Sequence, residues 1–159
     1  MLNVLVLCTG NSARSILAET LFRSLSEGRV TAYSAGSRPA GRVHPGALAK
    51  LEREGIVTEG LRSKSWDEFS GSDAVAMDIV ITVCDNAKGE TCPVWYGSPV
   101  RVHWGLPDPA AAPDELVAEA FDKAFEALSA RIRAALVLPL EDMGSQELAD
   151  ALARIHETA

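Results

Sequence analysis

The sequence is poor in cysteine, histidine and aromatic residues. Its 159 residues include three cysteines and three histidines, and aromatic residues make up 6%. So few cysteines, and an odd number of them, are not the disulfide framework of a small secreted domain. In a reducing compartment such cysteines are buried bystanders, metal ligands or redox groups. Their positions along the chain have to distinguish these roles.

Basic residues are also in the minority. The chain has 15 Lys and Arg against 22 Asp and Glu, which gives a formal net charge of -7. An acidic surface of this kind keeps a small domain in solution and repels nucleic acid and anionic membranes. An anionic substrate would therefore need a local binding feature, because the field of the whole protein does not attract it.

Long apolar runs are missing as well. No stretch approaches the roughly 18 apolar residues that cross a bilayer. Residues 1–7 are apolar, but no basic residue precedes them and no small-residue cleavage site follows, unlike a signal peptide. We therefore expect a cytoplasmic protein that binds neither membranes nor nucleic acid. Its length is typical of one domain, which we place at residues 1–159.

The sequence does contain alternating strand-like and helix-like segments. Short apolar runs predict strands at residues 2–7, 30–34, 79–83 and 100–104. Apolar residues at helical spacing predict helices at residues 16–25, 44–55, 66–69 and 113–136 and from 145 onward. This alternation favours a three-layer α/β fold, in which a four-stranded parallel sheet carries helices on both faces.

Two of the cysteines come directly after predicted strands. Cys8 follows the first strand, and Cys84 follows the third. Ligands of open parallel sheets bind at the carboxyl ends of the strands. If these two strands are neighbours, the two sulfurs face the same crevice.

The segment that begins at Cys8 has the spacing Cys-x5-Arg-Ser. A loop between a strand and a helix can turn its N–H groups inward and, with the helix dipole, bind a tetrahedral oxyanion. Gly10 permits a tight path, and Asn11 tolerates a left-handed conformation. Arg14 supplies a planar fork that can bind two oxygens. The predicted oxyanion-binding residues are Thr9, Gly10, Asn11, Ser12, Ala13, Arg14 and Ser15.

The same loop is expected to activate the Cys8 thiol. A thiol at a helix N-terminus beside an arginine is shifted toward thiolate, the nucleophilic form. Ser15 can donate a hydrogen bond to this sulfur. Alternatively, Cys8 is a small core residue and Arg14 a surface charge. The position of the motif between a buried strand and a helix argues against that alternative.

This loop resembles the oxyanion loop of the low-molecular-weight protein tyrosine phosphatase superfamily. That superfamily contains tyrosine phosphatases and arsenate reductases coupled to thioredoxin-type reductants. The resemblance implies a flavodoxin-like fold and a nucleophilic role for Cys8. It extends from residue 1 to about residue 138 and includes Ser-Ala-Gly-Ser at 34–37, His-Pro at 44–45, and the segments 78–84 and 103–109.

Asp108 lies between two prolines, which leave it little conformational freedom. Displacement at phosphorus or arsenic needs a protonated leaving oxygen, which a fixed carboxylic acid can provide. Many Asp-Pro pairs only begin a turn, but the resemblance implies that Asp108 is the general acid. The tyrosine phosphatases continue with an aromatic residue, whereas Ala110 follows here. The site therefore suits a small inorganic oxyanion better than phosphotyrosine.

The resemblance also implies roles for all three cysteines. Cys8 attacks arsenate, and Cys84 then attacks Cys8, which releases arsenite and leaves a disulfide. Cys92 next attacks Cys84, and an external thiol reduces the resulting Cys84–Cys92 disulfide by ordinary exchange. The predicted function is arsenate reduction for arsenic detoxification. Its predicted catalytic residues are Cys8, Arg14, Cys84, Cys92 and Asp108.

Other functions stay open at this point. Cys84 is a buried strand-end residue in one alternative, which is common for free cysteine. Zinc binding by Cys84, Cys92 and His103 lacks the usual ligand spacing and a fourth ligand. A phosphatase on this scaffold would leave Cys84 and Cys92 idle. A non-catalytic anion or redox sensor is a third class, and nothing in the sequence favours it.

The expected partners and cofactors follow from arsenate reduction. Arsenate is the substrate, phosphate and sulfate compete with it, and no cofactor stays bound. The segment from Cys84 to Cys92 is one residue longer than is typical of thioredoxin-coupled members. The reductant is therefore thioredoxin, or glutathione with glutaredoxin. Some arsenate reductases bind potassium, and the positions that match their site are Asn11, Glu19, Ser34 and Asp67. Without a cation, Asn11 stabilises the loop, Glu19 is a helix charge, and the other two are capping residues.

Overall fold

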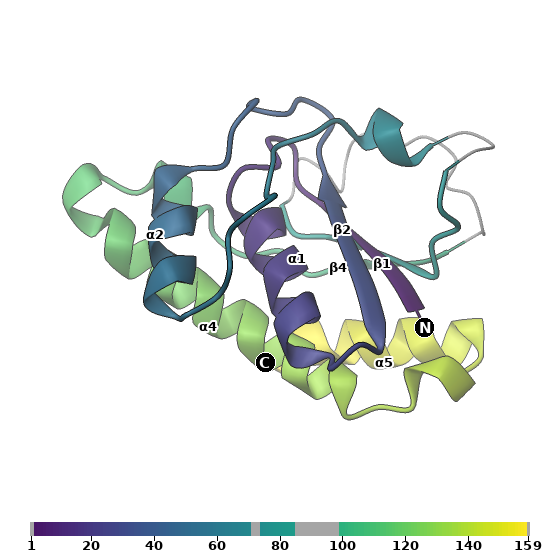
Figure 1. The fold of residues 1–159 in the computed structure, drawn as a ribbon. Coiled ribbons are helices and arrows are strands. Elements are labelled where there is room, and N and C mark those ends of the chain that lie inside the picture. The colour runs from purple at the N-terminus through teal and green to yellow at the C-terminus, as the bar shows by residue number, and fades with distance from the viewer. Residues whose placement is uncertain (1, 71–73, 85–98, 159) are drawn as a thin grey trace.

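The computed structural model describes residues 2–70, 74–84 and 99–158. Four strands in these ranges form one parallel sheet, and Figure 1 shows the α-helices on one side of it and the short helix at residues 66–69 on the other. The strand order β2-β1-β3-β4 is that of the flavodoxin-like fold, so the predicted fold class is confirmed. The strands are β1 (Leu2–Leu7), β2 (Val30–Ala35), β3 (Ile79–Thr82) and β4 (Val100–His103).

Each helix that the apolar spacing predicts is present. The α-helices are α1 (Arg14–Leu25), α2 (Pro45–Arg53), α4 (Val117–Leu136) and α5 (Ser145–Thr158). The 3₁₀ helices are η1 (Trp66–Phe69), η2 (Pro109–Ala111), η3 (Asp114–Leu116) and η4 (Leu140–Asp142). Within the described ranges, no helix is long and apolar enough to span a membrane.

The central strand β1 is buried on both faces. Val4 and Val6 belong to the larger core cluster on one face of the sheet. Leu5 and Leu7 belong to a smaller cluster on the other face. Successive side chains of a strand point to opposite faces. The two core clusters therefore explain why this run is apolar without interruption.

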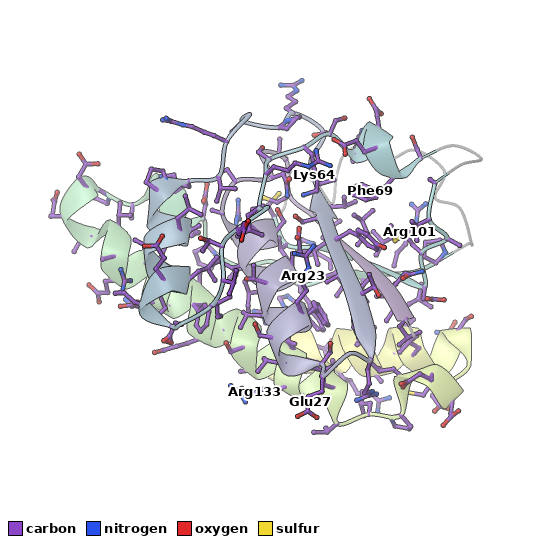
Figure 2. All side chains as sticks on the ribbon, viewed as in Figure 1. Arg23, Glu27, Lys64, Phe69, Arg101 and Arg133 are labelled. Atoms are coloured by element: carbon purple, nitrogen blue, oxygen red, sulfur yellow. The ribbon has the colours of Figure 1, made fainter. Side chains whose placement is uncertain are left out.

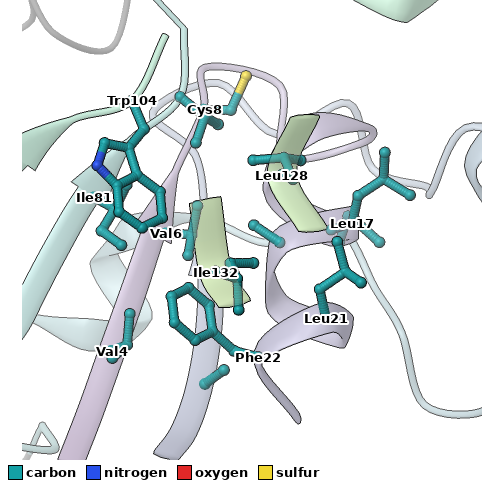
Figure 3. Close-up of a cluster of buried hydrophobic side chains, with 14 of the residues drawn as sticks. Val4, Val6, Cys8, Leu17, Leu21, Phe22, Ile81, Trp104, Leu128 and Ile132 are labelled. Carbon is teal, nitrogen blue, oxygen red and sulfur yellow. The ribbon is translucent and has the colours of Figure 1, made fainter. Parts of the chain in front are cut away.

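The two faces of the sheet are covered differently. Helix α1 packs on β1 and β2, α5 packs on β4, and α4 lies against α1. Figure 3 shows Leu17, Leu21 and Phe22 of α1 meeting Leu128 and Ile132 of α4. On the other face, within the described residues, η1 contributes Phe69, whose ring lies 5.4 Å from that of Tyr33.

Helix α4 begins later than the sequence predicts. The apolar pattern extends back to Pro113, but the chain forms the 3₁₀ helices η2 and η3 before α4 begins at Val117. Pro113 is itself extended, with ψ 151°, as is Ala112 before it. The Leu116 N–H then donates to the Pro113 carbonyl oxygen at 2.8 Å, a 3₁₀ turn of the kind that often precedes an α-helix. The two short turns connect the Asp108 loop closely to α4.

The ends of β1 and β3 lie side by side, as expected for neighbouring strands. Leu7 pairs with Ala35 of β2 on one side and with Thr82 of β3 on the other. The Val83 N–H donates to the Leu7 carbonyl oxygen at 3.0 Å. The residues that follow β1 and β3 therefore enter the same crevice at the carboxyl edge of the sheet.

Gly36 has no room for a side chain. A Cβ there would lie 2.3 Å from the Thr9 carbonyl oxygen and 2.4 Å from that of Cys8. We predict that Gly36→Ala displaces the loop after β1 and lowers the free energy of unfolding by about 1–3 kcal/mol. Urea denaturation measures this change. Ser37→Ala is the control, because the Ser37 hydroxyl is buried with no hydrogen-bond partner in the described part of the chain. Equal stability of the two variants would contradict the prediction.

Candidate active site

The loop after β1 is held from outside through its carbonyl oxygens. The backbone N–H groups of Arg38, Ala40 and His44 donate to the carbonyl oxygens of Thr9, Gly10 and Ser12, at 3.0, 2.9 and 2.9 Å. Because the N–H and C=O of one peptide group point in opposite directions, the N–H groups of Gly10 and Ala13 face inward. The Gly10 N–H is directed at the Cys8 sulfur.

Asn11 fixes the tightest part of this loop. Its φ is 43°, the left-handed conformation that the sequence predicts, and its side chain is fully buried. Its Nδ2 donates to Ser15 Oγ at 2.8 Å, and its Oδ1 accepts from the Lys64 N–H at 2.9 Å. Ser15 is thus bound to Asn11, and no hydrogen bond joins Ser15 to Cys8 among the described residues.

A small cavity of about 150 Å³ opens inside the loop. It brings together most of the residues that the sequence nominates, and Figure 3 shows Cys8 at the end of β1, beside the buried core. Asn11 and Ser15 support the cavity without lining it, and Cys92 lies outside the described residues. The lining residues are Cys8, Thr9, Gly10, Ser12, Ala13, Arg14, Cys84 and Asp108.

The Arg14 guanidinium lies at one side of the cavity with an unused donor. Its Nη1 donates to the Leu106 carbonyl oxygen at 2.9 Å, and its Nη2 lies 3.6 Å from Asp108 Oδ2. Its Nε is buried and has no hydrogen-bond partner in the part of the chain that the structure describes. An oxyanion in the cavity would supply the missing acceptor, because guanidinium binds such anions through two nitrogens.

Asp108 is held beside the cavity by its own turn. Its Oδ1 accepts from the Ala110 N–H at 3.0 Å, while Oδ2 faces Arg14. The side chain is 41% exposed. The carboxylate therefore lies within reach both of solvent protons and of a group bound near Arg14, as a general acid requires.

Arg131 anchors this loop, although the sequence did not identify it as a site residue. Its Nη1 donates to the carbonyl oxygens of Trp104 and Gly105, at 2.9 and 3.3 Å. Burial lowers the pKa of Arg131 below its ordinary value. The sequence could have indicated this role, because Arg131 lies on the apolar, buried stripe of α4, between Leu128 and Ala135. A charged residue on such a stripe needs a partner in the core.

The two thiols meet across the cavity. Cys8 and Cys84 are both buried, and a hydrogen bond joins their side chains. The Thr9 N–H also donates to Cys84 Sγ, at 3.3 Å. The structure thus bears out the expectation that the two sulfurs share one crevice, because β1 and β3 are neighbours.

The pKa of Cys8 differs from the expectation. The hydrogen bond that the Cys8 thiol donates to Cys84, and then burial, raise the pKa of Cys8 against the opposing effects of Arg14 and the Gly10 N–H. The predicted shift toward thiolate considered only the arginine and the helix. It was wrong for this arrangement, because a second thiol shares the proton and two negative sulfurs repel each other.

The residues nominated for potassium make other contacts. Glu19 Oε1 lies against the Ser34 hydroxyl and 3.5 Å from Lys64 Nζ. Asp67 belongs to η1, and no hydrogen bond or ion pair joins it to Glu19 or Ser34 among the described residues. No group of three or more His, Cys, Asp or Glu side chains suited to a metal occurs in the described ranges.

The family follows from comparison with known proteins. Residues 3–147 match the model of the low molecular weight phosphotyrosine protein phosphatase family. The chain belongs to this family. The match covers β2, β3, β4, all but the first residue of β1, and the loop after β1.

Relatives within this family are named arsenate reductases. One from Halalkalibacterium halodurans is 37% identical over 106 residues, covering 67% of this chain and 73% of the relative. A glutaredoxin arsenate reductase from Synechocystis is 33% identical over 109 residues, 69% of this chain and 79% of the relative. Both matches cover about two thirds of the chain studied.

Solved structures of arsenate reductases are also similar to this chain. An arsenate reductase in the phosphate binding state superposes with a TM-score of 0.65 at 29% identity, covering 84% of this chain and 98% of that one. A thioredoxin-dependent arsenate reductase from Corynebacterium glutamicum gives 0.62 at 29% identity, covering 84% of this chain and 59% of that one.

Replacing Arg14 by lysine tests its role in anion binding. Lysine keeps the charge but has no planar fork, so we predict that Arg14→Lys weakens phosphate binding by about tenfold or more. Isothermal titration calorimetry measures this affinity. Arg38→Lys is the matched control, since Arg38 is exposed and contacts the loop through its backbone N–H. Equal affinities for the two variants would exclude an Arg14 fork.

The effect of Cys84 on Cys8 predicts a change in pH dependence. Because Cys84 raises the pKa of Cys8, Cys84→Ala leaves the lowering effects of Arg14 and the Gly10 N–H in place. Alkylation of Cys8 by iodoacetamide should then begin at lower pH. Rates are compared in Cys92→Ala and in Cys84→Ala/Cys92→Ala, with the site of alkylation located by mass spectrometry. An unchanged profile, or a shift to higher pH, would contradict the prediction.

Proposed function

We propose that this chain is an arsenate reductase that converts arsenate to arsenite in arsenic detoxification. The observation that carries the proposal is the pair of hydrogen-bonded cysteines, Cys8 and Cys84, that line one oxyanion-sized cavity. Hydrolysis of a phosphomonoester on this scaffold needs a single cysteine. Reduction of arsenate needs two electrons, and two thiols in contact can supply them by forming a disulfide.

The cavity suits a small inorganic substrate. It is lined by inward N–H groups, Arg14 and Asp108, and its volume is about 150 Å³. The residue after the Asp-Pro pair is Ala110, where the tyrosine phosphatases place an aromatic side chain against their substrate. Arsenate, phosphate and sulfate share a tetrahedral shape, so we expect phosphate and sulfate to compete with arsenate for the loop.

In the first step, Cys8 attacks the arsenic atom as thiolate, after its proton passes to its hydrogen-bond partner Cys84. Cys84 passes this proton on to an arsenic-bound oxygen before the second step. A bond forms between the Cys8 sulfur and arsenic, and one arsenic–oxygen bond breaks. Asp108 gives its proton to the leaving oxygen, which departs as water. Arg14 and the inward N–H groups stabilise the negative charge on the remaining oxygens. Arsenic is still in the +5 state in this adduct.

In the second step, Cys84 attacks the sulfur of Cys8. The sulfur–arsenic bond breaks, and its electron pair stays on arsenic, which leaves as arsenite in the +3 state. The two thiols lose these electrons and become a Cys8–Cys84 disulfide. The Thr9 N–H, which already donates to Cys84 Sγ at 3.3 Å, stabilises that sulfur as thiolate before the attack.

The third step returns Cys8 to the thiol form. Cys92, outside the described residues, attacks Cys84 and leaves a Cys84–Cys92 disulfide for an external dithiol to reduce. Relatives named as thioredoxin-dependent and as glutaredoxin arsenate reductases support a reductant of this class. We propose thioredoxin first and glutathione with glutaredoxin second. Both reductants belong to the reducing cytoplasm, where we place the protein.

A single turnover without added thiols tests this function. The reduced protein, freed of small thiols, receives arsenate, and both arsenite and disulfides are measured, the latter by mass spectrometry. We expect stoichiometric arsenite and a Cys84–Cys92 bridge. Cys84→Ser should release no arsenite, because no thiol then attacks the adduct. Cys92→Ser should stop with a Cys8–Cys84 bridge.

The opposite result would identify a phosphatase. Cys8→Ser removes the nucleophile shared by both functions and is the control for each assay. Absence of arsenite, together with hydrolysis of a phosphomonoester that persists in Cys84→Ser and Cys92→Ser but not in Cys8→Ser, would contradict the proposal.

A further inference from the structure

A half-buried ammonium group, that of Lys64, lies behind the oxyanion loop. The Lys64 side chain is 9% exposed, and its Nζ lies 3.5 Å from Glu19 Oε1 and 3.4 Å from Ser34 Oγ. It also donates to the Arg62 carbonyl oxygen at 3.0 Å. Figure 2 shows Lys64 and, on α1, Arg23. A charge that is largely removed from water needs such partners. These contacts therefore fix the position of the Lys64 ammonium.

The backbone of Lys64 holds the loop directly. Its N–H donates to Asn11 Oδ1 at 2.9 Å, and its carbonyl oxygen accepts from the Gly36 N–H at 3.0 Å. The neighbouring Ser63 hydroxyl donates to the Gly10 carbonyl oxygen at 3.0 Å. One short segment thus joins the oxyanion loop to the end of β2, and its ammonium joins both to α1.

We infer that the Lys64 ammonium takes the place of a bound monovalent cation and is a positioning residue for the oxyanion loop. The inference rests on the proposed function for its link to arsenate, but it concerns the loop itself. Three of the four residues nominated as potassium ligands contact Lys64. They are Asn11, Glu19 and Ser34.

These contacts do not fit a potassium ion. Asn11 Oδ1 accepts a hydrogen bond from the backbone, and Glu19 Oε1 faces the ammonium. Glu19 Oε2 lies 2.7 Å from Arg23, so this buried carboxylate already has two cationic partners. A further cation would be repelled by both, and repulsion is strong where water is excluded. The protein therefore carries its own cation at this place.

Removing the ammonium should create the missing cation site. Without Lys64 Nζ, Glu19 keeps a buried oxygen that, among the described residues, has only the Ser34 hydroxyl beside it. A half-paired buried carboxylate is unstable and attracts a cation. The space left by the ammonium group fits potassium or ammonium, which are of similar size, better than the smaller sodium ion. The loop should then depend on the salt in solution, because Glu19 and Ser34 lie on the two elements, α1 and β2, that frame the loop.

The test compares phosphate binding in potassium and sodium salts at equal ionic strength. Calorimetry with inorganic phosphate reports on the loop without any arsenate chemistry, and thermal unfolding provides a second readout. For the unaltered protein we expect the two affinities to agree within about twofold. The melting temperature should also be the same in both salts, because no specific cation binds.

Variants of Lys64 should behave differently. Lys64→Ala should weaken phosphate binding by about tenfold or more in sodium and recover in potassium or ammonium salts. Its melting temperature should rise with potassium concentration. Lys64→Met fills the space without a charge and should stay weak in every salt. Lys50→Ala is the matched control, since Lys50 is also an amine with an 11% exposed side chain, but it pairs with Asp122, 2.9 Å away on α4.

Three results would overturn the inference. Potassium-specific tightening of phosphate binding in the unaltered protein is the first, and it needs no variant to fold. The second is normal phosphate affinity of Lys64→Ala in sodium. The third is a loss of phosphate affinity in Lys64→Ala that neither potassium nor ammonium restores. If phosphate binds as expected but no arsenite forms, the proposed function fails while Lys64 keeps its role in the loop.

Discussion

The site depends on three carbonyl oxygens that point away from it. Those of Thr9, Gly10 and Ser12 bond to amides outside the loop, which turns neighbouring N–H groups toward the cavity. The outer partners belong to the segment after β2, which approaches closely because residue 36 is glycine. Anion binding, the position of Arg14 and the exposure of Cys8 to substrate all follow from this inverted loop. Because outside hydrogen bonds already fix these peptide groups, the loop does not have to rearrange when an anion binds.

Strand order then decides what chemistry the loop can perform. Since β1 lies between β2 and β3, the chain leaves its carboxyl edge in two directions and opens a crevice there. Cys8 and Cys84 enter that crevice from adjacent strands and share a proton. A lone thiol beside Arg14 would be a stronger nucleophile at rest. In the pair, Cys8 is a weaker nucleophile at rest, but the two thiols together can donate two electrons by forming a disulfide.

Much of this site could be predicted from sequence, because it depends on local order. The Cys-x5-Arg-Ser spacing after an apolar run predicts the loop, and strand ends predict the crevice. Lys64, Arg131 and the raised pKa of Cys8 could not be predicted, since each depends on contacts between distant segments, such as Asn11 with Lys64. The start of α4 was misplaced because the apolar pattern does not distinguish an α-helix from the 3₁₀ turn that residues 114–116 form after the extended Pro113.

A structure of Cys8→Ser with bound phosphate tests the central claim, the inverted loop as an oxyanion site, most directly. This variant cannot form a covalent adduct, so the anion should occupy the cavity unchanged. The account predicts phosphate inside the loop, with Arg14 Nε and a second guanidinium nitrogen on its oxygens and with the Asn11–Lys64 contact preserved. Phosphate bound elsewhere, or an Arg14 that keeps Nε unpaired, would contradict it.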